Sequence, residues 1–317
     1  MKVQLVSELS AFTPERETLL TIGVFDGVHL GHRHLIKKLT QQAAGGNLLT
    51  GVVTFKSNPK AVLSPRTKLA RLTTLEERAG LLKSLGVSLV VPLTFTTDVA
   101  ALSAREFVVY LKQYLKMRGL IIGPNFALGR HREGNTAALK SLGQELGFTV
   151  EVVKPLMLEG TLVSSTAIRG ALAHGDMKTV ARLLGRYFSL SGPVAAGVER
   201  GHILGFPTAN MQVDPEQALP ENGVYATLAH LGDEVYQSVT NIGVKPTFGK
   251  SERTVEVHIL GFTGDLYGKK LTIELVERLR PEMKFAGPEE LTAQIKKDVE
   301  QAKMILKKLL AGAKHGG

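Results

Sequence analysis

Short apolar runs and helical stripes alternate along the first half of the chain. Residues 19–25, 48–55, 87–93 and 119–123 form nearly continuous apolar runs, whereas the segments between them space apolar residues three to four positions apart. Near-continuous apolar strands separated by helices indicate a parallel sheet that is covered on both faces. We therefore expect an α/β doubly wound domain over residues 1–186.

Capping signals support individual helices in this half. Ser103 is a predicted helix N-cap with Glu106 at the capping-box position. Further on, residues 164–185 predict two short helices that are joined at His174–Asp176.

The pattern changes at about Ser189. Glycine and proline now separate short runs of alternating apolar and polar residues, which predicts an antiparallel barrel or sandwich over residues 187–317. The chain closes with an amphipathic helix that begins near Pro288 and that we expect to pack on this second domain. Its apolar face is predicted to contain Leu291, Ile295, Val299, Ala302, Ile305 and Leu309.

Composition narrows the kinds of protein that fit. With 44% hydrophobic and 21% charged residues, the 317-residue chain can bury a core and is not disordered. Its net charge of +10 suits an anionic partner such as a nucleotide or a nucleic acid, although a solvated basic surface would carry the same charge. The absence of cysteine excludes disulfides, thiolate metal sites and cysteine nucleophiles. With Glu8 near the start and no long apolar run, we expect a cytoplasmic protein without signal peptide or membrane span.

The first motif that carries chemistry is GVFDGVHLGH, residues 23–32. A predicted strand ends at Phe25, the chain turns, and His29 and His32 stand where a helix begins. Imidazoles beside helix N–H groups can bind phosphate oxygens and stabilise negative charge. The alternatives are two solvent-facing histidines and a weaker zinc site with His29, His32 and His34. The pattern resembles the HxGH signature of nucleotidyltransferases, and its candidate substrate-binding positions include Gly23, Phe25, Asp26 and Gly31.

A second motif opens the helix after residue 163. Ser164, Ser165 and Thr166 bring hydroxyls and backbone donors to a helix N-terminus, and Arg169 lies three to five residues further on. Taken alone, such a segment is more often an ordinary helix cap. Together with the histidine motif, it predicts a second group of phosphate contacts.

The third motif lies in a glycine-containing loop. Gly197, Gly201 and Gly205 precede Pro207-Thr208-Ala209-Asn210. A hydroxyl and an amide are hard oxygen ligands, so Thr208 and Asn210 are candidates to hold Mg²⁺ and phosphate, although such a tetrapeptide can equally be a turn.

The fourth motif is an alternating strand over residues 254–262. Val255, Val257 and Ile259 share one predicted face, and Glu256 and His258 share the other. A carboxylate that faces a phosphate loop can accept a hydroxyl proton during phosphoryl transfer, which makes Glu256 a candidate base. For an arbitrary strand, a solvent-facing glutamate would be the simpler interpretation.

These four motifs, in this order, resemble the bifunctional bacterial FAD synthetase family, in which a riboflavin kinase is joined to an FMN adenylyltransferase. Supporting matches follow the same order along nearly the whole chain, at residues 71–82, 103–108, 183–188, 239–249, 265–271 and 278–285. The resemblance implies a nucleotidyltransferase domain over 1–186 and a six-stranded riboflavin-kinase barrel with a C-terminal helix over 187–317.

The resemblance also implies roles for particular residues. The residues implied to bind ATP phosphates in the first domain are His29, His32, Ser164, Ser165, Thr166 and Arg169. In the second domain, Thr208 and Asn210 would hold Mg–ATP, Glu256 would act as base on riboflavin, and Arg280 would lie near the flavin. The implied partners are riboflavin, FMN, FAD and ATP, with no nucleic acid or membrane, for a monomer or weak homo-oligomer.

Four positions depart from the family pattern. One is His202, which stands where an arginine is frequent in the kinase loop. Val24 and Asn58 stand where the family commonly has asparagine and histidine, respectively. Asn125 stands where an aspartate is frequent, so it keeps a polar contact for the substrate without the charge.

Two other classes of protein share parts of the pattern. A class I aminoacyl-tRNA synthetase carries a similar histidine signature, but it also needs a lysine-rich catalytic loop, for which residues 116–118 are a poor substitute. An RNA-binding barrel would show clustered basic residues and exposed stacking aromatics on its strands. Here the aromatics lie mainly in glycine-flanked loops and alternating strands.

Overall fold

The computed structural model describes residues 2–64, 69–195, 205–247 and 250–313. The chain divides into two compact units, Met1–Ser165 and Thr166–Gly317. This division lies some twenty residues before the predicted domain boundary at 186/187, which stays a prediction.

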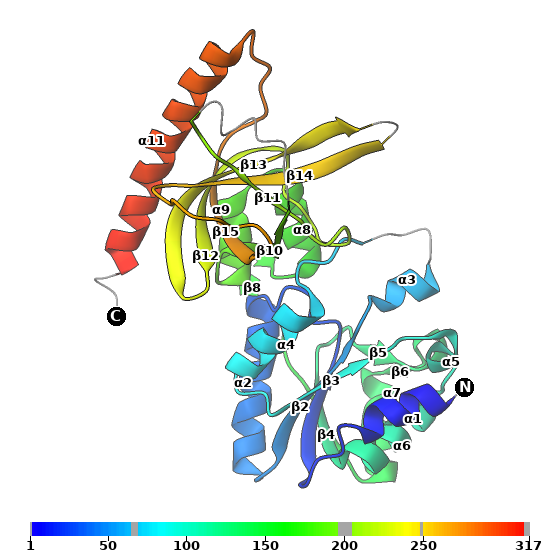
Figure 1. The fold of residues 1–317 in the computed structure, drawn as a ribbon. Coiled ribbons are helices and arrows are strands. Elements are labelled where there is room, and N and C mark those ends of the chain that lie inside the picture. The colour runs from blue at the N-terminus through cyan, green and yellow to red at the C-terminus, as the bar shows by residue number, and fades with distance from the viewer. Residues whose placement is uncertain (1, 65–68, 196–204, 248–249, 314–317) are drawn as a thin grey trace. The chain divides into compact units, whose positions relative to one another are not determined.

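Unit 1 is built around a five-stranded parallel sheet with the order β3-β2-β1-β4-β7 (Figure 1). Its strands are β1 (Thr18–Ile22), β2 (Leu49–Phe55), β3 (Leu89–Leu93), β4 (Met117–Ile122) and β7 (Thr149–Val152). Its α-helices are α1 (Lys2–Ser10), α2 (Leu30–Gly45), α3 (Pro59–Leu63), α4 (Leu75–Ser84), α5 (Thr97–Ala100), α6 (Ala104–Leu115) and α7 (Thr136–Leu146). Shorter elements are β5 (Ala127–Leu128), the 3₁₀ turn η1 (Arg130–Arg132), β6 (Gly134–Asn135), β8 (Met157–Leu158) and β9 (Thr161–Leu162).

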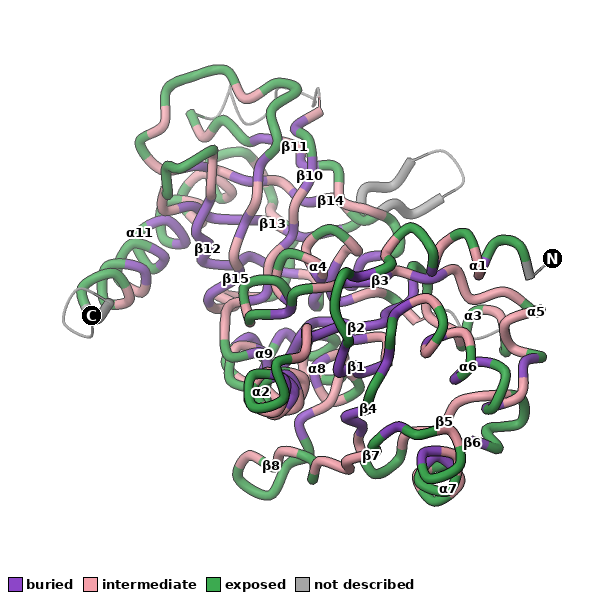
Figure 2. The backbone as a smooth tube through the Cα atoms, turned by 90° about the horizontal axis from the view of Figure 1, so that it is seen from below, coloured by how far each residue is buried: buried purple, intermediate pink, exposed green. Residues whose placement is uncertain are grey.

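Two apolar cores cover the two faces of this sheet, as the near-continuous apolar strands predict. Neighbouring strand residues alternate between them: Leu20, Val53, Val91 and Leu120 face one core, and Leu19, Val52, Val90 and Ile121 face the other. The first core also contains side chains from α1, α6 and α7, and the second contains side chains from α2 and α4. Figure 2 shows the buried strands between helices whose outer sides are exposed. The doubly wound α/β architecture is confirmed.

Helix α6 begins as its sequence predicts. The Ser103 hydroxyl accepts the backbone N–H of Glu106, and the Glu106 carboxylate accepts the backbone N–H of Ser103 at 2.9 Å. Helix α4 has the same reciprocal cap, formed by Thr74 and Glu77. Both caps satisfy backbone donors that a helix N-terminus otherwise leaves unpaired.

Unit 2 is a closed antiparallel barrel with the strand order β10-β11-β14-β13-β12-β15. The six strands are β10 (Phe188–Ala195), β11 (Ala209–Met211), β12 (Gly223–Leu231), β13 (Glu234–Thr247), β14 (Lys250–Ile259) and β15 (Lys270–Arg280). The long helix α11 (Pro288–Ala313) lies along the outside of the barrel (Figure 1). Val299, Ala302 and Leu306 of α11 join an apolar cluster with strand residues such as Val224 and Ala226. The six-stranded barrel and its C-terminal helix are therefore confirmed.

The predicted helix pair is present as α8 (Ser165–Ala173) and α9 (Met177–Leu184). Helix α9 packs on β10 and β15 of the barrel. The backbone N–H of Glu221 donates to the carbonyl of Leu172 at 2.9 Å, and Lys178 pairs with Glu277 at 3.3 Å. We call these two helices the helix pair.

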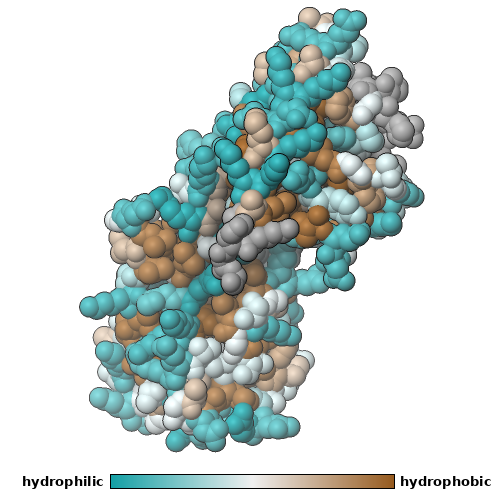
Figure 3. Space-filling view, turned by 90° about the vertical axis from the view of Figure 1, so that its left-hand side faces the viewer, coloured by the Kyte–Doolittle hydropathy of each residue, from teal (hydrophilic) through white to brown (hydrophobic). Residues whose placement is uncertain are grey.

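On the face drawn in Figure 3, hydrophilic side chains interrupt the hydrophobic patches.

Candidate active sites

The sheet of unit 1 has a switch point between β1 and β4. The chain passes from β1 through α2 to β2 on one side, whereas β4 lies on the other side of β1. In doubly wound sheets, ligands bind outside the carboxyl ends of the strands at such a point. The loops that leave these ends are residues 23–29 after β1 and 123–126 after β4, and both contain predicted site residues.

The loop after β1 has an unusual backbone. Its φ angles are 52° at Phe25, 83° at Gly27 and 40° at Val28. Glycine adopts a positive φ freely, but a β-branched valine in this region is strained. Such strain persists only where the surroundings fix the chain, and both Phe25 and Val28 are buried.

Asp26 provides much of that fixation. Its carboxylate accepts the backbone N–H groups of Leu72 at 3.0 Å and Thr73 at 3.1 Å. Its carbonyl accepts the Ser165 hydroxyl at 2.9 Å, which brings the histidine loop and the start of the second motif together. The proposed contact of Asp26 with a substrate stays a prediction.

Arg78 is a site residue that our sequence reasoning missed. Only 2% of it is exposed, and its guanidinium donates to the carbonyl of Val24 and, at 3.0 Å, to that of Phe55. Burial lowers the pKa of Arg78, and the nearby Asp26 carboxylate partly opposes this effect. One signal in the sequence could have revealed Arg78. It stands three residues after Leu75 and four before Leu82, so an arginine occupies a position on the apolar face of helix α4.

The two motif histidines lie at the start of α2. His29 is the N-cap, and its Nδ1 accepts the backbone N–H of His32 at 3.2 Å. The two imidazole rings stack with their centroids 3.6 Å apart and their planes at 15°. Because Nδ1 of His29 accepts a hydrogen bond, the proton of its neutral ring is on Nε2, which is then a donor.

His32 is held in its neutral form. Burial, followed by the neighbouring His29 and Arg78, lowers the pKa of His32 well below its usual value of 6.5. Its Nδ1 is buried and has no hydrogen-bond partner within the described ranges. A buried nitrogen without a partner is costly, so this atom marks a place where a polar ligand group would be stabilised.

Gly31 permits the close packing of this helix start. A Cβ atom at this position would lie 3.1 Å from the Val163 carbonyl oxygen and 3.2 Å from Cε1 of the His29 ring. Both contacts are tighter than normal van der Waals distance, so any side chain here would displace the histidine or the segment that leads to Ser164.

The remaining predicted residues of the first site are partly brought together. Ser164 directly precedes α8, and Ser165 is its first residue; Thr166 and Arg169 follow within this helix. Residues from Thr166 onward belong to unit 2. The roles of all four residues stay predictions. Asn125 is exposed after β4, and its carbonyl accepts the Arg132 guanidinium at 3.1 Å.

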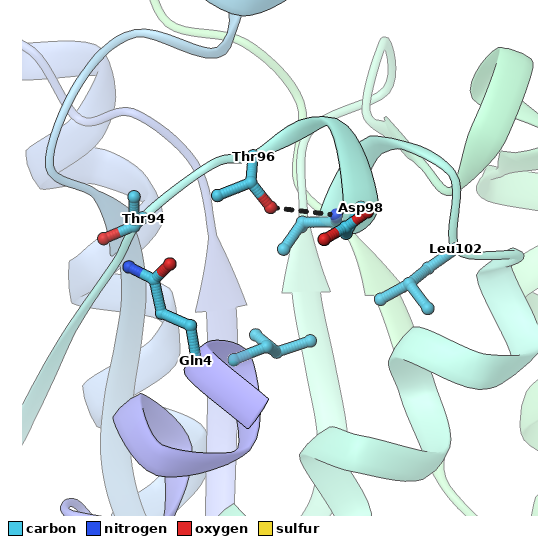
Figure 4. Close-up of a pocket in the computed structure, with 7 residues that line it drawn as sticks. Gln4, Thr94, Thr96, Asp98 and Leu102 are labelled. Atoms are coloured by element: carbon cyan, nitrogen blue, oxygen red, sulfur yellow. Dashed lines mark hydrogen bonds between the residues drawn. The ribbon is translucent and has the colours of Figure 1, made fainter. Parts of the chain in front are cut away.

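A shallow hollow elsewhere in unit 1 is lined by none of the predicted residues. Figure 4 shows Gln4, Thr94, Thr96, Asp98 and Leu102 around it, near α1 and the segment that follows β3. Thr96 caps α5 by accepting the backbone N–H of Val99 at 3.3 Å. We assign no catalytic role to this hollow.

In unit 2, the barrel brings two predicted residues of different motifs together. Asn210 on β11 lies directly opposite Glu256 on β14, and Asn241 on β13 lies opposite Glu256 on its other side. Val255 and Val257 are 3% and 1% exposed, so they face the barrel interior, and they share one face of β14 as predicted. The half-buried Glu256 and Asn210 therefore share the outer face of the barrel.

The segment before β11 is more exposed. Gly205 has a φ of 79°, which suits a glycine, and Pro207 and Thr208 are exposed. The Thr208 hydroxyl and the Asn210 amide are hard oxygen donors of the kind that Mg²⁺ prefers. Within the described ranges, no group of three or more His, Cys, Asp or Glu residues is placed to bind a metal. Gly197 and Gly201 lie outside the described residues.

Arg280, the last predicted residue, is engaged with helix α11. Its Nε donates to both carboxylate oxygens of Asp298 at 3.0 Å, and its Nη2 donates to Oδ2 at 2.8 Å. Nη1 donates to the carbonyl of Pro281, and the Phe285 ring centroid lies 5.7 Å from the guanidinium carbon. These contacts hold the chain after β15 against α11, and a flavin contact of Arg280 stays a prediction.

Comparison with known proteins gives a consistent result for both units. A family model described as FAD synthetase matches residues 12–167, and one described as riboflavin kinase matches residues 184–306. The bifunctional riboflavin kinase/FMN adenylyltransferase of Escherichia coli (strain K12) is 38% identical over 287 residues, which cover 90% of this chain and 91% of the relative. The protein of the same name from Pseudomonas fluorescens is 38% identical over 306 residues, which cover 96% and 98%.

A solved structure also resembles most of the chain. The crystal structure described as a macrolide-efflux protein from Streptococcus pneumoniae has a TM-score of 0.87 and 28% sequence identity, and it covers 93% of this chain and 96% of its own. Within the residues described here, no helix has the length and apolar character that crossing a membrane requires.

The two family matches follow one another along the chain, and the curated relatives carry both activities over nearly its full length. The chain therefore belongs to the bifunctional riboflavin kinase/FMN adenylyltransferase family and acts in flavin cofactor biosynthesis.

Proposed function

We propose that the two activities use separate sites, one at the histidine loop of unit 1 and one on the outer face of the barrel. The first site transfers the adenylyl group of ATP to FMN. The second transfers the γ-phosphoryl group of ATP to riboflavin.

In adenylyl transfer, a phosphate oxygen of FMN attacks the α-phosphorus of ATP, and the bond to the pyrophosphate leaving group breaks. Negative charge increases on the leaving oxygen. The Nε2–H of His29, the N–H groups of the first turn of α2 and the hydroxyls of Ser164 and Ser165 are the donors that we assign to the ATP phosphates. No side chain forms a covalent intermediate, so this catalysis consists of positioning and charge stabilisation.

In phosphoryl transfer, the terminal ribityl hydroxyl of riboflavin attacks the γ-phosphorus of ATP and releases ADP. Glu256 accepts the hydroxyl proton. Thr208 and Asn210 bind the nucleotide. Asn210 lies on the neighbouring strand β11, and Thr208 lies in the segment that leads into this strand.

Mg²⁺ is part of this proposal. Its function is to neutralise phosphate charge and to orient the transferred group. Thr208 and Asn210 supply oxygen donors of the type that this ion prefers.

The observation that carries the kinase assignment is the register that sets Asn210 opposite Glu256. These two residues lie 46 positions apart along the chain, in different motifs. Directly opposed residues have Cβ atoms about 5 Å apart. A nucleotide ligand and a base at this separation can act on one γ-phosphoryl group.

Four broader properties also belong to this proposal. We assign residues 1–186 to the adenylyltransferase and 187–317 to the kinase, as the sequence pattern suggests. We also propose a cytoplasmic monomer or weak homo-oligomer without a nucleic-acid partner. The dependence of both reactions on ATP supports the cytoplasm.

The test is to incubate the full chain with riboflavin, ATP and Mg²⁺ and to separate the flavin products over time. FMN is expected first and FAD second. His32→Ala is expected to stop at FMN, whereas Glu256→Gln is expected to leave riboflavin unchanged and still convert added FMN to FAD. Equal loss of both steps in both folded variants would contradict the assignment of separate sites.

A further inference from the structure

His258 connects strand β14 to the segment that carries Thr208. Its Nδ1 lies 2.8 Å from the carbonyl oxygen of Pro207. Since a carbonyl oxygen only accepts hydrogen bonds, Nδ1 of His258 is the protonated nitrogen. The same ring meets the Phe206 ring edge-on, with the centroids 5.5 Å apart and the planes at 76°.

The β ladder cannot provide this connection. Strand β11 begins at Ala209, which pairs with Val257, so Pro207 and Thr208 lie just beyond the ladder. Pro207 has no N–H, so its carbonyl is its only backbone hydrogen-bonding group. The contact with His258 therefore fixes this segment at Pro207, the residue directly before Thr208.

His258 also lies on the same strand as Glu256, the proposed base. His258 follows Glu256 by two residues, and both side chains lie on the outer face of β14. One strand therefore positions Glu256 directly and Thr208 through the Pro207 carbonyl.

We propose that His258 is a positioning residue for the riboflavin kinase reaction, which it serves by holding the Pro207 carbonyl so that the Thr208 hydroxyl is presented to Mg–ATP. The inference rests on the proposed nucleotide-binding role of Thr208. His258 itself touches neither substrate nor the transferred phosphoryl group.

Three substitutions in the full chain separate the hydrogen bond from the bulk of the ring. The Nδ2 atom of asparagine is bonded to Cγ, as Nδ1 of histidine is, so His258→Asn can still donate to Pro207. Glutamine places its amide nitrogen one bond further out, so His258→Gln loses this geometry, and His258→Ala loses the donor. All three variants lose the ring contact with Phe206.

The kinetic test measures total FMN plus FAD formed from riboflavin at varied ATP. His258→Ala and His258→Gln are expected to lower kcat/KM for ATP about tenfold, the factor that corresponds to a hydrogen bond of about 1.4 kcal/mol. His258→Asn is expected to stay close to wild type, and the KM for riboflavin is expected to stay unchanged in all three. His230→Ala, a control at another barrel histidine that pairs with Glu274 at 3.3 Å, is expected to behave as wild type.

A second readout does not depend on activity. Hydrogen–deuterium exchange of a peptide containing residues 205–211 is expected to be faster in His258→Ala and His258→Gln than in wild type and His258→Asn. The conversion of added FMN to FAD in the same preparations verifies that unit 1 is intact.

The outcomes are distinct. If asparagine and glutamine give the same kinetics and the same exchange, or if alanine changes neither, the positioning role of His258 is wrong. If Thr208→Ala leaves the kinetics for ATP unchanged, the proposed function of Thr208 fails instead, whatever the His258 variants do.

Discussion

The imidazole rings of His29 and His32 stack 3.6 Å apart, and the backbone N–H of His32 donates to Nδ1 of His29. The hydrogen bond caps helix α2, and the stacking places two titratable rings in direct contact. Because the pKa of His32 lies well below its usual value, this ring is uncharged at neutral pH. We infer that neutral N–H donors, more than an imidazolium charge on His32, bind phosphate here.

The lowered pKa of His32 predicts a pH dependence of stability. Below pH 6.5 the unfolded chain takes up a proton at this residue while the folded chain does not, so the free energy of unfolding decreases as the pH falls. The slope is at most about 1.4 kcal/mol per pH unit and ends at the folded pKa. Urea unfolding of wild type and His32→Gln between about pH 7.5 and 5 measures it.

The glutamine variant is expected to show a shallower decrease than wild type. His34→Gln changes an exposed histidine two residues away and is expected to keep the wild-type slope. Identical slopes for wild type and His32→Gln would show that His32 does not titrate as the structure indicates.

Substitution of Gly31 is expected to impair FAD formation selectively. In Gly31→Ala the new methyl group would meet the Val163 carbonyl at 3.1 Å and the His29 ring at 3.2 Å, so the ring must move. A misplaced phosphate donor costs roughly 10- to 1,000-fold in rate. Conversion of FMN to FAD measures the loss, and phosphorylation of riboflavin is expected to continue.

Gly45→Ala is the matched control in the same helix. A Cβ atom there meets nothing within 4 Å. The substitution is expected to leave both activities unchanged and to stabilise α2 by up to about 1 kcal/mol. A Gly31→Ala enzyme as active as this control would refute the steric argument.

Arg78 is expected to be critical for the stability of unit 1. Arg78→Leu removes the buried guanidinium that donates to the carbonyl oxygens of Val24 and Phe55, and we expect a loss of about 3 kcal/mol. Arg78→Lys should rescue this only partly, since one ammonium cannot reproduce the planar guanidinium. Arg118→Leu removes an exposed arginine 3.3 Å from Glu17 and is expected to cost less than about 1 kcal/mol. Denaturant unfolding would contradict the prediction if both leucine variants were equally stable.

The Arg280–Asp298 pair makes the corresponding prediction for unit 2. Asp298 is 3% exposed, so Asp298→Ala leaves a largely buried guanidinium without its carboxylate, at an expected cost of about 3–5 kcal/mol. Glu300→Ala, on the same helix, removes only the surface pair with Lys303 at 2.8 Å. Thermal unfolding followed by riboflavin kinase activity should separate the two variants. A similar melting temperature for both would mean that α11 does not depend on this pair.

Much of the fold could be predicted because its signals are local. Leu19 and Leu20 are both buried since each faces a different core, which is why the strand pattern is continuous rather than alternating. The cap formed by Ser103 and Glu106 and the helix pair joined at residues 174–176 follow from neighbouring residues in the same way.

The geometry of the first site could not be predicted from local pattern. The positive φ angles of Phe25 and Val28 run against the preferences of those residues. They are imposed by partners far along the chain: the Asp26 carboxylate binds backbone groups at Leu72 and Thr73. Arg78 was missed for the same reason, since a pattern of spacing does not reveal which carbonyl groups a buried guanidinium meets.

The second site shows a similar limit. Alternation predicts that Glu256 and Val257 face opposite sides of β14, and burial confirms this. Alternation within one strand does not determine the register between two strands. The pairing of Asn210 with Glu256 is therefore known only from the structure of the barrel.

The helix pair α8–α9 has a practical consequence for dissecting this enzyme. Helix α9 packs on β10 and β15, and the backbone N–H of Glu221 donates to the Leu172 carbonyl. A recombinant fragment that starts at residue 187 would lack both helices, so the surfaces of β10 and β15 that α9 covers would be exposed to solvent. The newly solvent-facing surface would favour aggregation. Anyone who wishes to express the kinase alone, or to exchange it between homologues, should place the cut ahead of α8.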